Sequence, residues 1–141
     1  MDRGTLLRVW LPLTGGLAVL GWMFRYGPGP HGLVRLLGLL LGLVGLAGVI
    51  FARYTLGRSF SIAPKATALV TSGIYSRIRN PIYVSSVIFL TGLALITGQP
   101  ALLAVLFVIV PMQIIRARRE AAVLEAKFGD AYREYRKRTW F

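Results

Sequence analysis

The chain has 141 residues, of which 55% are hydrophobic, with a formal net charge of +12 and no cysteine. A mean hydropathy of +0.63 excludes an ordinary soluble domain and indicates one integral membrane domain over residues 1–141. Without cysteine there is no disulfide framework, thiolate nucleophile or thiolate metal site, and the single histidine, His31, lies in a Gly-Pro loop that does not support a metal centre.

Four apolar segments approach the roughly 20 residues that a helical membrane span needs. The first, residues 5–24, contains Trp10 and Trp22 and exceeds a signal-peptide core in length, so we expect it to be retained. The second covers residues 36–52, and the short third and fourth, 81–97 and 100–115, form a hairpin that we expect to cross the membrane. The sequence thus predicts an all-α membrane bundle of four transmembrane helices with a cytoplasmic C-terminal helical segment.

Basic residues concentrate in two places. One is the polar segment of residues 56–83, here named the bridge, and the other is the tail from Arg116 onward. If both termini and the bridge face the cytoplasm, Arg25 and Arg35 are the two basic residues left outside, which fits the positive-inside rule. We expect this basic face to attract anionic lipid headgroups. No nucleic-acid-binding module accompanies the charge, so a nucleic-acid partner is not expected.

The predicted helices contain no acidic residue, because none occurs between Asp2 and Glu120. Proton-coupled carriers and intramembrane acid-base enzymes need an ionisable relay inside the membrane, so the helices are expected to be a scaffold. Four glycines of the second segment recur at spacings of four, three and three, which favours close approach of helix backbones. They are Gly38, Gly42, Gly45 and Gly48.

The third span is preceded by a helix-start signal, because Asn80 can cap free backbone amides and Pro81 suits the first helical position. In the simplest interpretation Asn80 only caps the helix, Gly73 serves a turn, and Arg79 extends to lipid phosphates. The same groups also suit ligand binding, because a helix N-terminus beside an arginine attracts a carboxylate.

Aromatic and acidic groups also support the interpretation as a ligand-binding site. Tyr75 and Tyr83 offer aromatic faces that attract a cation. Glu120, the first acidic residue after the fourth span, is suited to hydrogen-bonding a ribose diol or an amine. The alternative for Glu120 is a surface ion pair with Arg116 at helical spacing, which contributes little.

The tail carries apolar residues at helical spacings of four, three, four, three and four. They are Ala117, Ala121, Leu124, Phe128, Ala131 and Tyr135. Gly129 is expected to interrupt this helix, with Asp130 capping a second short one. The tail then lies against the membrane or folds over the bridge, where Tyr132 and Arg136 would form part of a lid.

These motifs together resemble a known family. The bridge, the hairpin after it, Glu120 and the run Phe128-Gly-Asp-Ala-Tyr-Arg-Glu-Tyr135 are similar to the superfamily of isoprenylcysteine carboxyl methyltransferases and phospholipid methyltransferases, which are integral membrane enzymes. The resemblance implies an enzyme that uses S-adenosylmethionine, bound on the cytoplasmic side, and releases S-adenosylhomocysteine. In this interpretation residues 1–55 form two N-terminal spans, and residues 56–141 form the cofactor-binding half.

The resemblance also assigns site residues. The expected cofactor contacts are Leu69, Val70, Gly73, Tyr75, Asn80, Pro81, Tyr83 and Glu120. Two positions depart from the family pattern. Asn80 stands where carboxyl methyltransferases typically have histidine, and an asparagine here resembles the phospholipid branch instead. Ala121 replaces the second of two glutamates.

The leading functional prediction is methylation of a membrane-embedded lipophilic acceptor in the manner of isoprenylcysteine carboxyl methyltransferases. Arg79 is the candidate for aligning an acceptor carboxylate, and Glu120 is the candidate base if the acceptor is an amine. Phospholipid amine N-methylation is the first alternative. A non-catalytic membrane adaptor with a basic lipid-binding face is the alternative of a different class.

Overall fold

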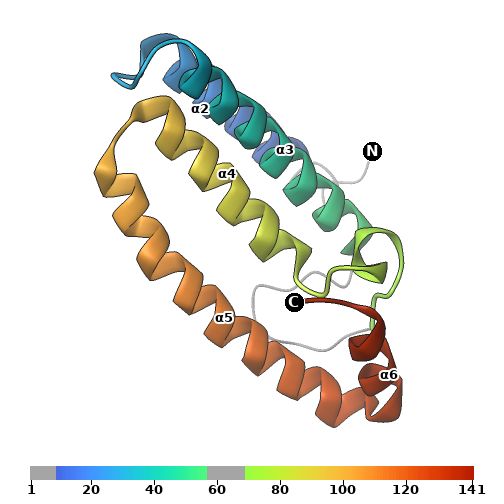
Figure 1. Ribbon diagram of the computed structural model, residues 1–141. Helices are drawn as coiled ribbons and strands as arrows, with labels where there is room; N and C mark the ends of the chain where they lie inside the picture. Colours follow the sequence, from blue (N-terminus) through green and yellow to red (C-terminus); the bar gives the residue numbers. More distant parts are fainter. Residues whose placement is uncertain (1–8, 57–68) are drawn as a thin grey trace.

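The computed structural model describes residues 9–56 and 69–141, and these parts of the chain are helical without a regular strand. In chain order the elements are α2 (Leu11–Tyr26), α3 (Leu33–Leu56), the short 3₁₀ helix η3 (Gly73–Ser76), α4 (Pro81–Thr97), α5 (Pro100–Phe128) and α6 (Asp130–Arg138). Helices α2, α3 and α4 pack together, α5 runs back beyond the start of α4, and α6 brings the C-terminus to that start (Figure 1). The predicted all-α class is confirmed for the described residues.

Two of the described helices, α3 and α5, are long and apolar enough to cross a membrane. Helix α4 is also apolar but has 17 residues. At 1.5 Å per residue it is about 25 Å long, a little less than the roughly 30 Å of a bilayer core. The arrangement of four membrane spans therefore stays a prediction.

The bounds of α4 agree with the predicted segment. Pro81 is its first residue, and Gly98, with a φ of 61°, ends it by donating its amide to the carbonyl of Ala94. Helix α3 is longer than the predicted 36–52 at both ends. Helix α2 reaches Tyr26 rather than residue 24, and residues 5–8 of the predicted first span lie outside the described residues.

The structure extends the helix beyond the predicted fourth span, whose end at residue 115 stays a prediction. Helix α5 continues without a break to Phe128, because residues 116–128 are mostly strong helix formers and nothing interrupts them before Gly129. One helix therefore joins the apolar hairpin to the basic tail.

Glycines bring α3 and α4 together. A Cβ atom added at Gly45 would meet the backbone of Phe89, and one added at Gly92 would meet the backbone of Gly42. Gly38 faces the backbone carbonyl of Gly92 in the same way. The close backbone approach predicted from the glycine spacing is confirmed, and the α3–α4 pair forms the rigid part of the fold.

Buried Arg35 fastens the loop between α2 and α3. Its guanidinium donates to the carbonyls of Met23 at 2.9 Å and Gly27 at 3.1 Å, both at the C-terminal end of α2. Gly29 of this loop packs on the end of α4, where an added Cβ would meet the backbone of Ile96. The α2–α3 loop and the α4–α5 turn thus lie together at the end of the molecule opposite η3.

Candidate active site

The described end of the bridge rests on the last turn of α3. Gly73 begins η3 with a φ of 58°, in the left-handed region that glycine favours, and an added Cβ would lie 3.0 Å from Cγ2 of Thr55. Tyr75 is buried in this turn, and Leu69 and Val70 are half-buried before it. Arg58, Ser59 and Lys65 of the bridge lie outside the described residues.

The C-terminal residues pair with the segment that enters α4. Trp140 donates its amide to the carbonyl of Arg77 at 3.0 Å, Arg79 donates to Trp140 at 3.2 Å, and Asn80 donates to Phe141 at 3.0 Å. The phenol of Tyr135 adds a bond of 2.7 Å to the carbonyl of Tyr75. Of the two placements expected for the tail, the structure has the one over the bridge.

Glu120 connects α5 to α4. Its Oε1 atom accepts a hydrogen bond of 2.8 Å from the Tyr83 hydroxyl and one of 3.2 Å from Nε of Arg116. The ion pair with Arg116 and the placement beside Tyr83, predicted as alternatives, therefore coexist. The Glu120 side chain is 27% exposed, so it remains within reach of solvent or a ligand.

The charge of Arg79 lies close to Tyr132 and Tyr135 of the tail. Its Nε is buried and has no hydrogen-bond partner among the described residues. The guanidinium lies near Tyr132, which is 3% exposed: burial raises the pKa of this phenol, and the Arg79 charge opposes that rise. A half-buried arginine with an unused Nε donor is a group that would hold an anion.

The tyrosines around Glu120 are neutral at physiological pH. Burial raises the pKa of Tyr75, and the neighbouring Tyr135 and Glu120 raise it further. Burial also raises the pKa of Tyr135 to about 12. These phenols therefore act as hydrogen-bond donors and aromatic walls rather than as bases.

Three local predictions were wrong. The Asn80 side chain makes no capping hydrogen bond, because residue 80 adopts a ψ of 57° while its amide pairs with Phe141. Gly129, not Asp130, is the N-cap of α6, and the Asp130 carboxylate instead pairs with Arg133 at 2.8 Å. The positive φ of Gly129 also turns the helix, so that Ala131 is exposed and Tyr132 takes the inward position.

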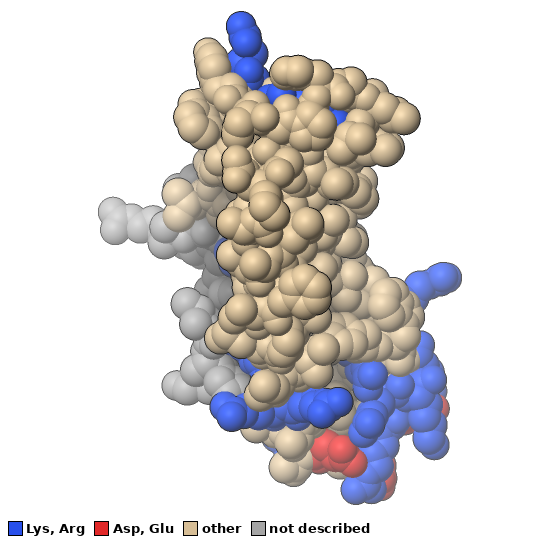
Figure 2. Space-filling model, turned by 60° about the vertical axis from the view of Figure 1, so that its left-hand side comes forward, with Lys and Arg blue, Asp and Glu red and all other residues tan. Residues whose placement is uncertain are grey.

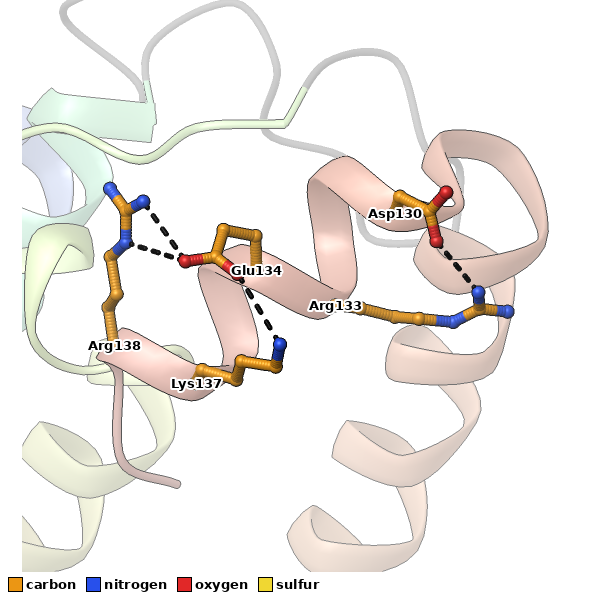
Figure 3. Close-up of polar contacts among 5 residues, drawn as sticks. All are labelled: Asp130, Arg133, Glu134, Lys137 and Arg138. Atoms are coloured by element: carbon orange, nitrogen blue, oxygen red, sulfur yellow. Dashed lines mark hydrogen bonds and ion pairs between the residues drawn. The ribbon is translucent and has the colours of Figure 1, made fainter.

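Charged side chains gather at this end of the molecule (Figure 2). On α6 the carboxylate of Glu134 pairs with Arg138 at 3.1 Å and with Lys137 at 3.5 Å, and Asp130 pairs with Arg133 (Figure 3). These pairs are exposed and contribute little stability individually. They leave an excess of arginine and lysine on the surface around the site.

Two contributions to this site were not expected from the sequence. One is the pairing of Trp140 and Phe141 with residues 77–80, which no short-range pattern announces. The other is a hydrogen bond of 2.9 Å from Gln113 of α5 to Ser86 of α4. Gln113 is the single polar side chain in the apolar stretch 100–115, and that isolation was the available signal.

No group of three or more His, Cys, Asp or Glu side chains placed to hold a metal ion occurs within residues 9–56 and 69–141. The polar groups that converge are instead a carboxylate, a guanidinium and phenols. This set matches an organic ligand with both charges, although the expectation that no metal is bound stays a prediction.

The fold and the site define a helical membrane protein with a polar, tyrosine-lined centre at one end of an apolar bundle. A family model described as phospholipid methyltransferase matches residues 33–131, and the chain belongs to the phospholipid methyltransferase family. The resemblance expected from the bridge and tail motifs is thereby confirmed, and so, at the level of the family, is the class of membrane methyltransferases.

A named relative supports the same superfamily. Over 89 residues the chain is 37% identical to Protein-S-isoprenylcysteine O-methyltransferase of Schizosaccharomyces pombe. The matched part is 58% of this chain and 37% of that protein, so the chain spans little more than a third of its relative's length. No solved structure matches the chain.

Proposed function

We propose that the chain is an S-adenosylmethionine-dependent methyltransferase that methylates a lipophilic acceptor embedded in the membrane. The observation that carries the proposal is the contact between Glu120 and Tyr83 at 2.8 Å, at the same end of the molecule as Arg79, whose buried Nε has no partner among the described residues. Family membership supports the reaction class.

The residues present fit the charged groups of this methyl donor. The unused donor of Arg79 suits its carboxylate. Glu120 uses Oε1 for Tyr83 and Arg116, and its remaining acceptor capacity suits a ribose diol or an amine. The faces of Tyr75 and Tyr83 suit a sulfonium cation. When bound, the donor supplies an activated methyl group on a cationic sulfur.

The residues proposed to hold the donor are those that the family resemblance assigns. Asn80 has a side-chain amide that is not used for capping, whereas fully buried Pro81 contributes by starting α4 where the Tyr83 ring can reach Glu120. The proposed set is Leu69, Val70, Gly73, Tyr75, Asn80, Pro81, Tyr83 and Glu120.

Methyl transfer to a carboxylate or amine needs orientation and exclusion of water more than it needs covalent chemistry. We assign alignment of an acceptor carboxylate to the remaining N–H groups of the Arg79 guanidinium, and removal of an amine proton, where one is removed, to Glu120. The tail, fixed to residues 75–80 by Tyr135 and Trp140, excludes water from this side of the site.

Two acceptor classes are supported by different findings. The name of the Schizosaccharomyces pombe relative favours O-methylation of an isoprenylcysteine carboxylate. The family description favours N-methylation of a phospholipid amine. We place the carboxylate first because the positive charge of Arg79 would attract a carboxylate and would repel an amine that still carries its proton.

The proposal includes a membrane arrangement. Residues 1–141 form one domain with four spans, residues 1–55 contributing two and residues 56–141 the cofactor-binding half. Both termini and the site face the cytoplasm, where anionic lipid headgroups contact the basic surface, and neither nucleic acid nor metal takes part.

Binding and turnover test the proposal on the detergent-purified full chain. We expect saturable calorimetric binding of S-adenosylhomocysteine, and transfer of labelled methyl to an S-prenylated cysteine with a free carboxylate. Transfer to phosphatidylethanolamine instead would select the second acceptor class. Absence of saturable binding at millimolar ligand would favour the non-catalytic adaptor.

A further inference from the structure

The hairpin of α4 and α5 contains a polar contact between the two helices inside its apolar part. Nε2 of Gln113 donates to Oγ of Ser86 at 2.9 Å, and that hydroxyl donates in turn to the carbonyl of Tyr83 at 2.9 Å. No other residue between 100 and 115 has a polar side chain. A carboxamide is costly to place in lipid, so its presence at this position requires a reason.

The contact between Gln113 and Ser86 lies on the same helix faces as the candidate site. Gln113, Ala117 and Glu120 are spaced by four and three residues and therefore share one face of α5. Ala117 is the one buried residue of this helix. On α4, Ser86 and Tyr83 are three residues apart and meet Gln113 and Glu120 respectively. Two hydrogen-bonded contacts thus join the same pair of faces.

The two contacts fix the axial position of α5. Gln113 and Glu120 are about 10.5 Å apart along their helix, and Ser86 and Tyr83 about 4.5 Å along theirs, at 1.5 Å per residue. The long Tyr83 ring makes up the difference by reaching toward Glu120. A slip of α5 by one residue would move the Glu120 carboxylate by about 1.5 Å and turn it by about 100°, which breaks a hydrogen bond of this length.

Little else holds α5 at this level. Helices α3 and α4 are fastened by glycine contacts, but most of the apolar part of α5 stands away from the other described helices (Figure 1). The exposed large side chains of this stretch include Leu103, Val105, Phe107, Val108, Met112 and Ile115. Such contacts with lipid do not specify register, whereas a directed hydrogen bond does.

We propose that Gln113 is a positioning residue: its bond to Ser86 sets the register of α5 on α4 and so holds the Glu120 carboxylate at the Tyr83 hydroxyl. What Glu120 does there rests on the proposed function. The placement of the two helices does not, and it can be measured without turnover.

The natural absence of cysteine allows that measurement. Spin labels on cysteines introduced at exposed Arg77, before α4, and exposed Val123, on α5, report the distance between the helices by double electron-electron resonance. We expect Gln113→Leu and Ser86→Ala to shift or broaden this distance distribution. Each should also weaken S-adenosylhomocysteine binding and raise the KM for the methyl donor about threefold to tenfold, with a smaller change in kcat, as suits loss of one interhelical hydrogen bond.

Matched controls remove a similar group without touching the contact. Thr91→Val deletes a hydroxyl that bonds only within α4, to the carbonyl of Val87, and Met112→Leu alters the residue beside Gln113. Both should leave distance and affinity unchanged. In the Ser86→Ala, Gln113→Leu double variant the effects should not add, because both changes remove the same bond.

An unchanged distance distribution in both single variants overturns the positioning role, whatever the activity. Additive losses in the double variant overturn it as well. If instead the wild-type chain binds no S-adenosylhomocysteine while the variants still shift the distance, the proposed function fails and the role of Gln113 in placing α5 stands.

Discussion

Arg77 and Arg79 are two residues apart, yet they have different surroundings. The Arg77 side chain is exposed, whereas Arg79 is half-buried with an Nε that finds no partner among the described residues. Because both lie next to the backbone pairing with Trp140, they offer a matched comparison in which charge is constant and burial differs.

We predict that Arg79→Lys lowers the affinity for S-adenosylhomocysteine about tenfold or more, whereas Arg77→Lys changes it less than twofold. Lysine keeps the charge but lacks Nε and the planar fork, and a hydrogen bond to a charged group contributes roughly 1.5–3 kcal/mol. Calorimetry on the detergent-purified chain measures both. Equal effects of the two changes would remove Arg79 from the proposed site.

A second prediction concerns Tyr135, whose phenol donates to the Tyr75 carbonyl at 2.7 Å. Burial raises its pKa to about 12, from an ordinary value of about 10. The folded chain therefore keeps this proton where the unfolded chain has lost it. The resulting stability is fully present below about pH 10 and is lost as the pH rises toward 12.

In Tyr135→Phe we expect a loss of about 1 kcal/mol at neutral pH, because one hydrogen bond is removed. We also expect a smaller fall in the unfolding midpoint between pH 10 and 12 than in the wild type. Midpoints measured by circular dichroism across this range check both effects. Tyr54→Phe, at an exposed tyrosine, is the control and should follow the wild-type curve.

For single residues, the sequence indicated which residues belong to the site better than it indicated which of them contact each other. Tyr83 and Glu120 were both named as site residues, and helical spacing foretold the pair of Glu120 with Arg116. The Tyr83 contact joins residues 37 positions apart and is set by how α5 lies on α4. The capping role predicted for Asn80 failed for the same reason, since the distant Phe141 sets the backbone conformation there.

At the scale of the elements, the packing of α3 on α4 depends on glycines, which have no side chain. Gly45 has the backbone of Phe89 where a Cβ would stand, whereas nothing lies within 4 Å of the corresponding position at Gly21 in α2. Backbone cannot move aside as a flexible side chain can, so a single methyl group must separate the helices at the first position and has free space at the second.

We therefore predict that two glycine-to-alanine substitutions have different effects on the stability of the folded protein. Gly45→Ala should destabilise the protein by about 1–3 kcal/mol through overpacking. Gly21→Ala should leave stability unchanged or raise it by up to about 1 kcal/mol, because alanine is the better helix former. Thermal unfolding in one detergent compares them. A stable Gly45→Ala variant would contradict the close α3–α4 contact.

Element boundaries were predictable where local chemistry marks them. Pro81 and Gly98 delimit α4, and Gly129 was recognised as the break in the tail. Helix α5 continues past the end assigned to the fourth span, because hydropathy drops at Arg116 while helix propensity does not. Polarity marks where a helix leaves the membrane, and that point need not be where the helix ends.

At the scale of the molecule, the length of α5 matters most. Its 29 residues extend about 43 Å, and a bilayer core is roughly 30 Å thick. If its apolar part lies in the bilayer, we expect the end of α5, which carries Glu120, to reach the headgroup layer and water. The candidate site would then lie at the membrane surface, where a polar donor and a lipid-borne acceptor can meet.

The two ends of the bundle differ in charge. The α2–α3 loop packs on the α4–α5 turn at one end, while η3, α6 and most basic residues of the tail lie at the other (Figures 1 and 2). Because basic segments remain cytoplasmic, we predict that the site end faces the cytoplasm.

Single cysteines in this cysteine-free chain test the orientation. With a membrane-impermeant maleimide on intact cells, cysteines replacing Tyr26 and Gln99 should be labelled, whereas those replacing Arg77 and Lys137 should react only after the membrane is opened. All four residues are exposed, so packing does not decide reactivity. The reverse pattern would put the site on the outer face, away from the cytoplasmic methyl donor. Labelling of the Tyr26 and Lys137 variants from the same side would mean that α3 does not cross, and labelling of the Gln99 and Lys137 variants from the same side would mean that the hairpin does not cross.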